Sequence, residues 1–381
     1  MNESDNAMKK DAKDLKILQL GKFHPIRGGV EKVMLDLTTG LSARGISCDM
    51  LCAATRGSYT IRLNDRARII AVRSLANVKA PMMSPAMIVR LRRICRQYDI
   101  IHIHHPDPMA ALALRLSGFK GKVVLHWHSD ILRQRQLLRL IKPLQTWLLK
   151  RADVIVTTSP PYLEQSPWLA PYRDKCQCVP IGILPVDDAD QRAIDKLRKS
   201  VGGRKVVFSM GRLVGYKGFE YLIDAAALLP DDHIVVIGGT GPLRDQLQAR
   251  IEAAGLTEKV RLLGFVPEEA LPVYYRAASL FCMSSVERTE AFGVVLIEAM
   301  SCGTPIVATR IPGSGVPWVN ADGISGRNAE PRDARSLAEA IMAVTGDSDG
   351  QYSRGALERY RSHFTEEKML KNIIEIYRNM G

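Results

Sequence analysis

The feature that most constrains the fold is an alternation of short apolar segments of β type with helical stretches, repeated in two series along the chain. The first series includes residues 15–20, 47–53, 100–104, 123–128 and 154–157, and the second includes 206–210, 233–237, 260–263, 279–282 and 305–308. Short strands that alternate with helices predict parallel sheets covered by helices on both faces. The sequence therefore predicts an α/β protein with two doubly wound parallel-sheet domains.

The predicted domain boundaries follow from this pattern and from the length. The 381 residues exceed one ordinary core and suit two domains of about 150–200 residues each. We predict a disordered polar leader over 1–14, an N-terminal domain over 15–185 and a C-terminal domain over 186–360, followed by a final helix in 361–381. The proline-containing stretch 179–190 is typical of a linker.

The positive charge of the chain is concentrated in its first half. Residues 1–185 hold 29 basic and 14 acidic side chains, residues 186–381 hold 24 and 26, and residues 62–151 alone hold 18 and 4. This asymmetry favours a polyanionic partner for the first half: nucleic acid, anionic lipid head groups or a phosphorylated acceptor. The low aromatic content of 6% argues against a stacking surface for single-stranded nucleic acid.

Cysteine usage and hydropathy restrict the cellular environment and the kind of membrane contact that the sequence suggests. The seven cysteines are scattered and include no pair of CxxC motifs, which argues against a structural zinc site and suits a reducing cytosol. The leader has no apolar core and is not a signal peptide. No run approaches the ~18–20 apolar residues that span a bilayer, so we expect any membrane contact to be peripheral.

Two glycine motifs follow strands at positions where ligands bind. Gly28 and Gly29 precede the first helix, where adjacent glycines allow close backbone approach and a helix N-terminus favours an anion, although a plain tight turn explains them equally well. Gly239-Thr240-Gly241 follows a strand of the second series. Neither motif completes GxGxxG, which argues against a nicotinamide oxidoreductase.

Two cations follow the strand that ends at residue 210. Arg212 and Lys217, five residues apart in the segment from Gly211 to Gly218, would lie at the carboxyl edge of the sheet. Cations there can hold a diphosphate and stabilise it as a leaving group. Taken alone, a solvated basic loop explains them better.

The segment EAFGVVLIE at 290–298 decides between these alternatives. Phe292 and Gly293 would open a helix whose free N–H groups can hold a phosphate. Glu290 and Glu298 lie eight residues apart, a little over two helical turns, so both could address one elongated ligand. Glu298 lies on an otherwise apolar helix, where a carboxylate is costly unless it accepts hydrogen bonds, for example from ribose hydroxyls.

Together these motifs resemble the retaining GT-B glycosyltransferases of family 4, over about residues 15–380. The resemblance implies two Rossmann-like domains that face a central cleft, and a final helix, 361–381, that returns to the first domain. It also implies a nucleotide sugar held mainly by the C-terminal domain as co-substrate, with no cofactor and no metal. Two Asp-x-Asp strings, at 188–190 and 347–349, lie in polar linker-like stretches and do not suggest a metal site.

The resemblance also implies roles for single residues. His128, Glu290, Arg212 and Lys217 would act in catalysis, with His128 near the donor sugar and the acceptor. His126 alternates with His128 on the same strand and either could be the key histidine; we favour His128, which is closer to the end of the strand. The residues assigned to donor binding are Gly28, Gly29, Arg212, Lys217, Val266, Glu290, Phe292, Gly293, Val294, Val295 and Glu298.

Within the family, residues 128–131, 142–145 and 288–293 resemble bacterial O-antigen and lipopolysaccharide mannosyl- and rhamnosyltransferases. This implies a GDP-hexose donor, mannose or D-rhamnose, and a lipid-linked saccharide acceptor. Two basic amphipathic stretches, 87–98 and 131–151, would then contact the inner face of the cytoplasmic membrane, although ordinary helices with solvated cationic faces explain them as well. The alternatives are a UDP-sugar enzyme and, remotely, a non-catalytic nucleic-acid-binding protein; we expect no nucleic acid as partner.

Overall fold

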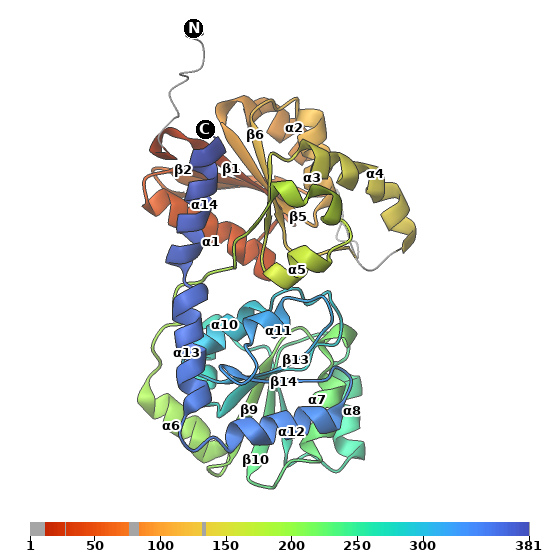
Figure 1. Cartoon of the computed structure of the whole chain (residues 1–381), viewed down its shortest axis with the longest axis vertical. Helices are drawn as coiled ribbons and strands as arrows, with labels where there is room; N and C mark the ends of the chain where they lie inside the picture. Colours follow the sequence, from red (N-terminus) through yellow and green to blue (C-terminus); the bar gives the residue numbers. More distant parts are fainter. Residues whose placement is uncertain (1–11, 27, 76–83, 132–134, 381) are drawn as a thin grey trace. The chain divides into compact units, whose positions relative to one another are not determined.

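The computed structural model describes residues 12–26, 28–75, 84–131 and 135–380, with only the backbone for 135–140. Most of the predicted leader and residues 132–140 of the second basic stretch therefore lie outside the residues, or the side chains, that are described. The chain divides into two compact units (Figure 1). The first contains residues up to 158 together with 163–181 and the segment from 366 onward, and the second contains 159–162 and 182–365.

The first unit is built on an eight-stranded sheet with the order β3-β4-β2-β1-β5-β6-β7-β8. The strands are β1 (Lys16–His24), β2 (Ser47–Ala54), β3 (Tyr59–Asn64), β4 (Ala67–Arg73), β5 (Ile100–His105), β6 (Lys122–Trp127), β7 (Val154–Thr157) and β8 (Cys176–Cys178). All neighbours are parallel except β3 and β4. Only two residues join β3 to β4, a connection too short for a parallel crossover, so the edge of this sheet is antiparallel.

The first strand differs from its prediction. The strand predicted over 15–20 is longer, because β1 continues to His24 past a register shift between Leu20 and Phe23. Gly21 and Lys22 both have positive φ at this irregularity. The bulge turns the backbone so that Lys22 leaves the regular pleat at the carboxyl end of the sheet.

Helices cover both faces of this sheet. They are α1 (Gly29–Ala43), α2 (Pro85–Ile94), α3 (Pro108–Ser117), α4 (Arg135–Arg151) and α14 (Glu366–Met380), with 3-10 turns at Ala12–Asp14, Cys95–Gln97 and Ala170–Lys175. The division of the chain between the two units falls within the short helix α5 (Pro160–Gln165). The final helix α14 runs beside α1 (Figure 1). Gly40 of α1 makes this approach possible, because a Cβ there would collide with Leu370. Through this contact the end of the chain covers the first sheet.

The second unit holds a six-stranded sheet that is parallel throughout, in the order β11-β10-β9-β12-β13-β14. Its strands are β9 (Lys205–Met210), β10 (His233–Gly238), β11 (Val260–Gly264), β12 (Leu280–Met283), β13 (Ile306–Thr309) and β14 (Gly326–Ala329). The strand order reverses between β9 and β12, and open α/β sheets bind ligands at the carboxyl ends of the strands at such a point. The loops after β9 and β12 are therefore where a site is expected.

The helices of this unit are α6 (Gln191–Ser200), α7 (Phe219–Ala226), α8 (Arg244–Ala253), α9 (Leu271–Ala277), α10 (Val294–Ser301), α11 (Val316–Val319), α12 (Ala334–Thr345) and α13 (Gln351–His363). Short 3-10 turns occur at Gly215–Lys217 and Glu268–Ala270. Leu222, Ile223 and Ile341 pack against the strand residues Val207 and Val235 in one buried core. This core fixes the strands whose ends carry the predicted site.

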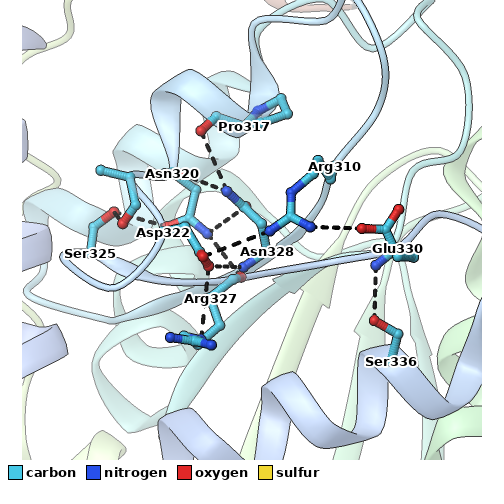
Figure 2. Close-up of polar contacts among 10 residues, drawn as sticks. Arg310, Pro317, Asn320, Asp322, Ser325, Arg327, Asn328, Glu330 and Ser336 are labelled. Carbon is cyan, nitrogen blue, oxygen red and sulfur yellow. Dashed lines mark hydrogen bonds and ion pairs between the residues drawn. The ribbon is translucent and has the colours of Figure 1, made fainter.

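A polar network fixes the edge strand β14 (Figure 2). The buried Asn320 donates from Nδ2 to Asn328 Oδ1 at 2.9 Å, and Asn328 Nδ2 donates back to the carbonyl of Asn320 at 2.9 Å. Arg310 lies between Glu330, at 2.7 Å, and Asp322, at 3.7 Å. These contacts satisfy buried amides and tie the edge strand to β13 and to the loop after α11, which accounts for a structural role.

Within the described residues, no helix is both long and apolar enough to cross a bilayer.

Candidate functional site

A lysine–glutamate pair occupies the point where the strand order of the second sheet reverses. Lys217 Nζ, from the loop after β9, lies 2.5 Å from Glu290 Oε2, from the loop after β12, and each side chain is 13% exposed. Ser285 Oγ donates to the same carboxylate oxygen at 3.2 Å. Two of the predicted catalytic residues, 73 positions apart in sequence, are therefore in direct contact.

The backbone around Lys217 is tied to the loop after β12. Ser284 Oγ donates to the carbonyl of Lys217 at 3.0 Å, and the N–H of Val286 donates to the carbonyl of Tyr216 at 2.8 Å. Gly218 has a φ of +62°, and a Cβ there would collide with the carbonyl of Ser284. Only glycine allows the two loops to lie this close, which fixes the lysine against Glu290.

The lysine of this pair is charged. Burial lowers the pKa of Lys217, but the neighbouring Glu290 carboxylate outweighs burial, and the pKa lies above its ordinary value. A buried ammonium held 2.5 Å from a carboxylate is a preorganised cation at the ligand-binding edge of the sheet.

Arg212 and the glycines near it complete this edge. Arg212 is exposed, and its side chain has no hydrogen-bond or ion-pair partner among the described residues, so its guanidinium is available to a ligand. A Cβ on Gly211 would lie 3.2 Å from Cε of Lys217, and one on Gly239 would collide with the carbonyl of Gly211. Small residues at these positions let the β9 and β10 loops pack closely beside the lysine.

The helix α10 begins at Val294, with Gly293 as its N-cap at a φ of +84°. The predicted helix opening at Phe292 and Gly293 is thus correct. Glu290 lies in the loop before the helix, however, so a spacing of a little over two helical turns does not describe how the two glutamates are placed. The loop before the helix is held by Ser314 Oγ, which donates to the carbonyl of Glu290 at 2.5 Å.

The side chains around α10 divide into core and surface. Phe292 is buried and meets Phe364 edge-to-face at 5.8 Å, so only its backbone is available to a ligand. Val294 and Val295 are half-buried in the first turn. Val266, after β11, is buried against Gly238, where a Cβ would lie 2.9 Å from Val266 Cγ2.

Glu298 has the hydrogen-bond donor that its apolar helix requires. Tyr275 Oη, on α9, donates to Glu298 Oε2 at 2.8 Å. Burial, reinforced by the Glu298 carboxylate, raises the pKa of Tyr275 well above its ordinary value, so the phenol stays protonated and donates. Glu298 is itself half-buried. Its position on α10 was predictable, but its tyrosine partner was not.

A row of imidazoles lines one face of the first sheet at the carboxyl ends of β5 and β6. His104 Nδ1 lies 2.9 Å from His128 Nε2, and His104 Nε2 lies 2.7 Å from Gln19 Oε1 on β1. His126 stacks on His128 with ring centroids 4.1 Å apart. Both His126 nitrogens are buried without a partner, whereas His128 is anchored by His104. His128 therefore has a fixed hydrogen-bond partner in the first unit, and the choice between His126 and His128 as the histidine that meets a ligand stays a prediction.

The imidazoles of this unit are neutral. Burial lowers the pKa of His102, His104 and His128 well below the ordinary value, with neighbouring imidazoles adding to the effect. The pKa values of His105 and His126 fall to about 3, also mainly through burial.

Three of these histidines form a candidate metal cluster. Nitrogen atoms of His102, His104 and His126 lie within 4.8 Å of one another. Both His104 nitrogens already have hydrogen-bond partners, His128 and Gln19. An ion would therefore displace one of these bonds, and the hydrogen-bonded row is the better account of the three residues.

The glycine loop of the first unit lies at the start of α1. Gly28 is the N-cap, with extended backbone, and both Gly28 and Gly29 are exposed. A Cβ on Gly28 would lie 3.1 Å from Oε2 of the buried Glu31. On the other side of this loop, the N–H of Lys22 donates to Asp107 Oδ2 at 2.5 Å. Exposed backbone with little room for a side chain suits close approach of a ligand.

The predicted site residues fall in both units. Gly28, Gly29 and His128 belong to the first, and the other predicted residues belong to the second. Residues that sequence reasoning missed are those that hold the predicted ones in place: Gln19, His104, Tyr275, Ser284 and Ser285. Ser284 and Ser285 come one residue after the predicted strand 279–282, which is the one sequence signal that pointed to this loop.

The Asp-x-Asp strings have local structural partners. Asp188 pairs with Arg276 at 2.7 Å and Asp190 caps α6 by accepting from the N–H of Arg192. Asp347 accepts from the N–H of Tyr352 at 2.8 Å, just inside α13.

Two family models match the chain in sequence. The glycosyltransferase family 4 model matches residues 27–183, and the model of glycosyl transferases group 1 matches residues 190–360.

Curated relatives match over nearly the full length. The O-antigen chain mannosyltransferase C of Escherichia coli is 29% identical over 356 residues, covering 92% of this chain and 94% of the relative. The D-rhamnosyltransferase WbpZ of Pseudomonas aeruginosa is 30% identical over 343 residues, covering 89% and 88%.

Solved structures share the fold. HepE of Anabaena in complex with UDP superposes with a TM-score of 0.77 at 22% identity, covering 96% of this chain and all of that one. WaaG, a glycosyltransferase involved in lipopolysaccharide biosynthesis, superposes with a TM-score of 0.68 at 17% identity, covering 95% and 99%. The predicted GT-B fold, with two doubly wound α/β domains, is confirmed. Together with the sequence matches over both halves, this shows that the chain is a glycosyltransferase and belongs to glycosyltransferase family 4.

Proposed function

We propose that this glycosyltransferase is a retaining, metal-independent hexosyltransferase that moves mannose or D-rhamnose from a GDP-sugar to a lipid-linked saccharide in O-antigen, lipopolysaccharide or related polysaccharide assembly. The observation that carries the proposal is the buried Lys217–Glu290 pair, at the point of the second sheet where nucleotides bind in such folds. The two curated relatives described above support the sugar and the acceptor class, since they are named as an O-antigen mannosyltransferase and a D-rhamnosyltransferase.

In the proposed mechanism the second unit stabilises the leaving group. The diphosphate gains negative charge as the bond to the sugar breaks. Arg212 supplies an unpaired guanidinium, Lys217 a buried ammonium, and the first turn of α10 at Gly293 supplies backbone N–H groups. Fixed donors that are already oriented need no reorganisation during the reaction, so they stabilise the transition state more than the bound substrate.

The remaining residues would orient the donor. Glu290, held by Lys217 and Ser285, would bind hydroxyls of the donor sugar, and Glu298 would bind the ribose. His128 would contact the sugar beside the reacting centre. No protein nucleophile is assigned, so the acceptor hydroxyl would attack the anomeric carbon from the face that the diphosphate leaves, which retains the anomeric configuration. Its proton would pass to the departing phosphate oxygen.

The nucleoside part of the donor would lie along α10 and the end of β11. Val295 would pack near the nucleoside and Val266 would line the base. Backbone groups of Phe292 and Val294 would contact sugar and phosphate. Gly28 and Gly29 in the first unit would contribute backbone to the diphosphate.

The donor nucleotide separates the main proposal from its alternative, a UDP-sugar enzyme. The fold neighbour HepE was solved in complex with UDP, so the fold by itself does not select a guanine nucleotide. We expect GDP to raise the melting temperature of the protein more than UDP at equal concentration, because a ligand at 100 times its Kd stabilises the folded state by about 2.7 kcal/mol. Thermal-shift titration measures this. A larger shift with UDP would reject the GDP assignment while leaving the transferase class intact.

Membrane contact is proposed through charge rather than insertion. The apolar face of α2 is buried in the protein through Met87, Leu91 and Ile94, while Arg92 and Arg93 are exposed. An apolar face already covered by protein cannot enter a bilayer, so attraction to anionic head groups is the remaining force. We expect the protein to sediment with vesicles rich in anionic lipid at low salt and to be released at 0.5 M salt. Equal binding to neutral vesicles would contradict this.

A further inference from the structure

A continuous chain of hydrogen bonds links the C-terminal helix to His128. Tyr377 Oη on α14 lies 2.6 Å from His102 Nδ1 and 3.4 Å from Gln19 Nε2. Gln19 Oε1 then meets His104 Nε2 at 2.7 Å, and His104 Nδ1 meets His128 Nε2 at 2.9 Å. All five side chains are buried and belong to the first unit.

The chemistry of these groups places the protons. An amide oxygen only accepts, so the oxygen of Gln19 requires His104 to carry its proton on Nε2. A neutral imidazole has one N–H, so His104 Nδ1 bears the lone pair. His128 Nε2 must then be the donor in the 2.9 Å contact. That leaves Nδ1 of His128 unprotonated, and it has no partner among the described residues.

Neutrality of His104 is what makes this assignment unique. Burial lowers the pKa of His104 well below its ordinary value, and the neighbouring imidazoles and Lys22 act in the same direction. A doubly protonated His104 would present an N–H to His128 and reverse the direction of the bond. The titratable groups that face His104 are His102, His126, His128 and Lys22, none of them acidic, so none of them favours its charged form.

We propose that Gln19 and His104 are positioning residues that hold His128 in the Nε2–H tautomer, with Nδ1 free to accept a hydrogen bond from a sugar hydroxyl. The tautomer assignment follows from the hydrogen bonds of the first unit alone. The role of this tautomer in sugar transfer rests on the proposed function. The tautomer of a histidine is set by the partner of its other nitrogen. At metal sites, where an outer partner orients a histidine in the same way, loss of that partner typically lowers affinity or activity about ten- to a hundredfold, and we expect an effect of this order here.

The test has a spectroscopic part that needs no substrate. Long-range ¹H–¹⁵N spectra of the full chain, labelled on its eight histidines, report which ring nitrogen carries the proton. Comparison with His128→Asn assigns the signals of His128. We expect Nε2–H at pH 7.5. An Nδ1–H signal for His128, as would follow if the amide of Gln19 were turned over, would overturn the inference.

Two substitutions at one position separate positioning from packing. Asparagine has a terminal oxygen one bond beyond Cγ, where histidine has Nδ1, so His104→Asn keeps an acceptor for His128, whereas His104→Phe removes it. We expect His104→Asn to preserve the tautomer and to retain kcat within about threefold. His104→Phe and Gln19→Leu should mix the tautomers and lower kcat about ten- to a hundredfold, with the KM for donor little changed. His363→Asn, at an exposed position in the second unit, is the matched control.

The outcomes are distinguishable from failure of the proposed function. A single Nε2–H tautomer in the wild type that is lost in His104→Phe supports the positioning role even if no sugar is transferred. An unchanged tautomer in both His104→Phe and Gln19→Leu overturns it whatever the activity. If His104→Phe does not fold, Gln19→Leu and His104→Asn still decide the question by the same spectra.

Discussion

Replacing Glu290 by glutamine is expected to lower kcat for sugar transfer by about 10²–10³-fold, the order of effect that follows the loss of one preorganised hydrogen-bonding group at a transition state. Glutamine keeps an oxygen that can accept from Lys217 and Ser285, so the loop geometry is retained. What is lost is the negative charge that fixes Lys217 and binds the donor sugar. Steady-state kinetics with the nucleotide sugar gives the measurement.

The controls for this substitution address folding and location. Glu339→Gln removes a carboxylate from the exposed face of α12 in the same unit and should leave kcat unchanged. Glu290→Ala should also destabilise the protein, because removing one partner of a buried pair leaves the other charge uncompensated, at a cost of about 3–5 kcal/mol in a fully buried case and less here. Full activity in Glu290→Gln would refute the site assignment.

The second large effect is loss of stability in mild acid. Five buried histidines, 102, 104, 105, 126 and 128, have pKa values below their ordinary value, mainly through burial. Between pH 6.5 and about 3 the unfolded chain binds protons that the folded chain does not. The histidines therefore do not lower the free energy of unfolding well above pH 6.5. As the pH falls below 6.5, the free energy of unfolding decreases by up to about 1.4 kcal/mol per pH unit for each histidine.

With five such groups, the free energy of unfolding falls by up to about 7 kcal/mol per pH unit. The total free energy of unfolding of a typical protein is only about 5–15 kcal/mol. We expect the first unit to unfold within about two pH units below 6.5. Circular dichroism at fixed temperature, measured as a function of pH, monitors this unfolding. His126→Leu should remove one titrating group and so lower the pH dependence of the free energy of unfolding by up to about 1.4 kcal/mol per pH unit. Stability at pH 7.5 should not fall, because neither nitrogen of His126 has a hydrogen-bond partner to lose. A melting temperature independent of pH between 7.5 and 5 would contradict neutral burial.

The fold was predictable because its signal is local. Strands such as β10 and β13 are short apolar runs, and their alternation with helices indicates parallel sheets wherever they occur. The antiparallel β3–β4 edge was missed because β3 is half-exposed and carries Arg62 and Asn64, which weaken an apolar pattern. The extension of β1 to His24 was missed because Gly21 suggests a turn, whereas here it forms a bulge.

The site was predictable only in part, for the same reason. Glu290, Glu298 and Lys217 belong to motifs of a few residues that can be recognised locally. Their partners come from distant segments: Tyr275 reaches Glu298 from another helix, and Gln19 reaches Tyr377 across 358 positions. Such contacts depend on how strands and helices pack, which periodicity and spacing do not specify.

The central claim is that this site transfers a hexose from a nucleotide sugar with retention. The most direct measurement is ¹³C NMR of the product formed from GDP-α-D-[1-¹³C]mannose and a lipid-linked saccharide acceptor. The account predicts a new glycosidic carbon with the one-bond C–H coupling of an α-mannoside, and its absence with Glu290→Gln. A β-mannoside, or free mannose as the sole labelled product, would contradict it.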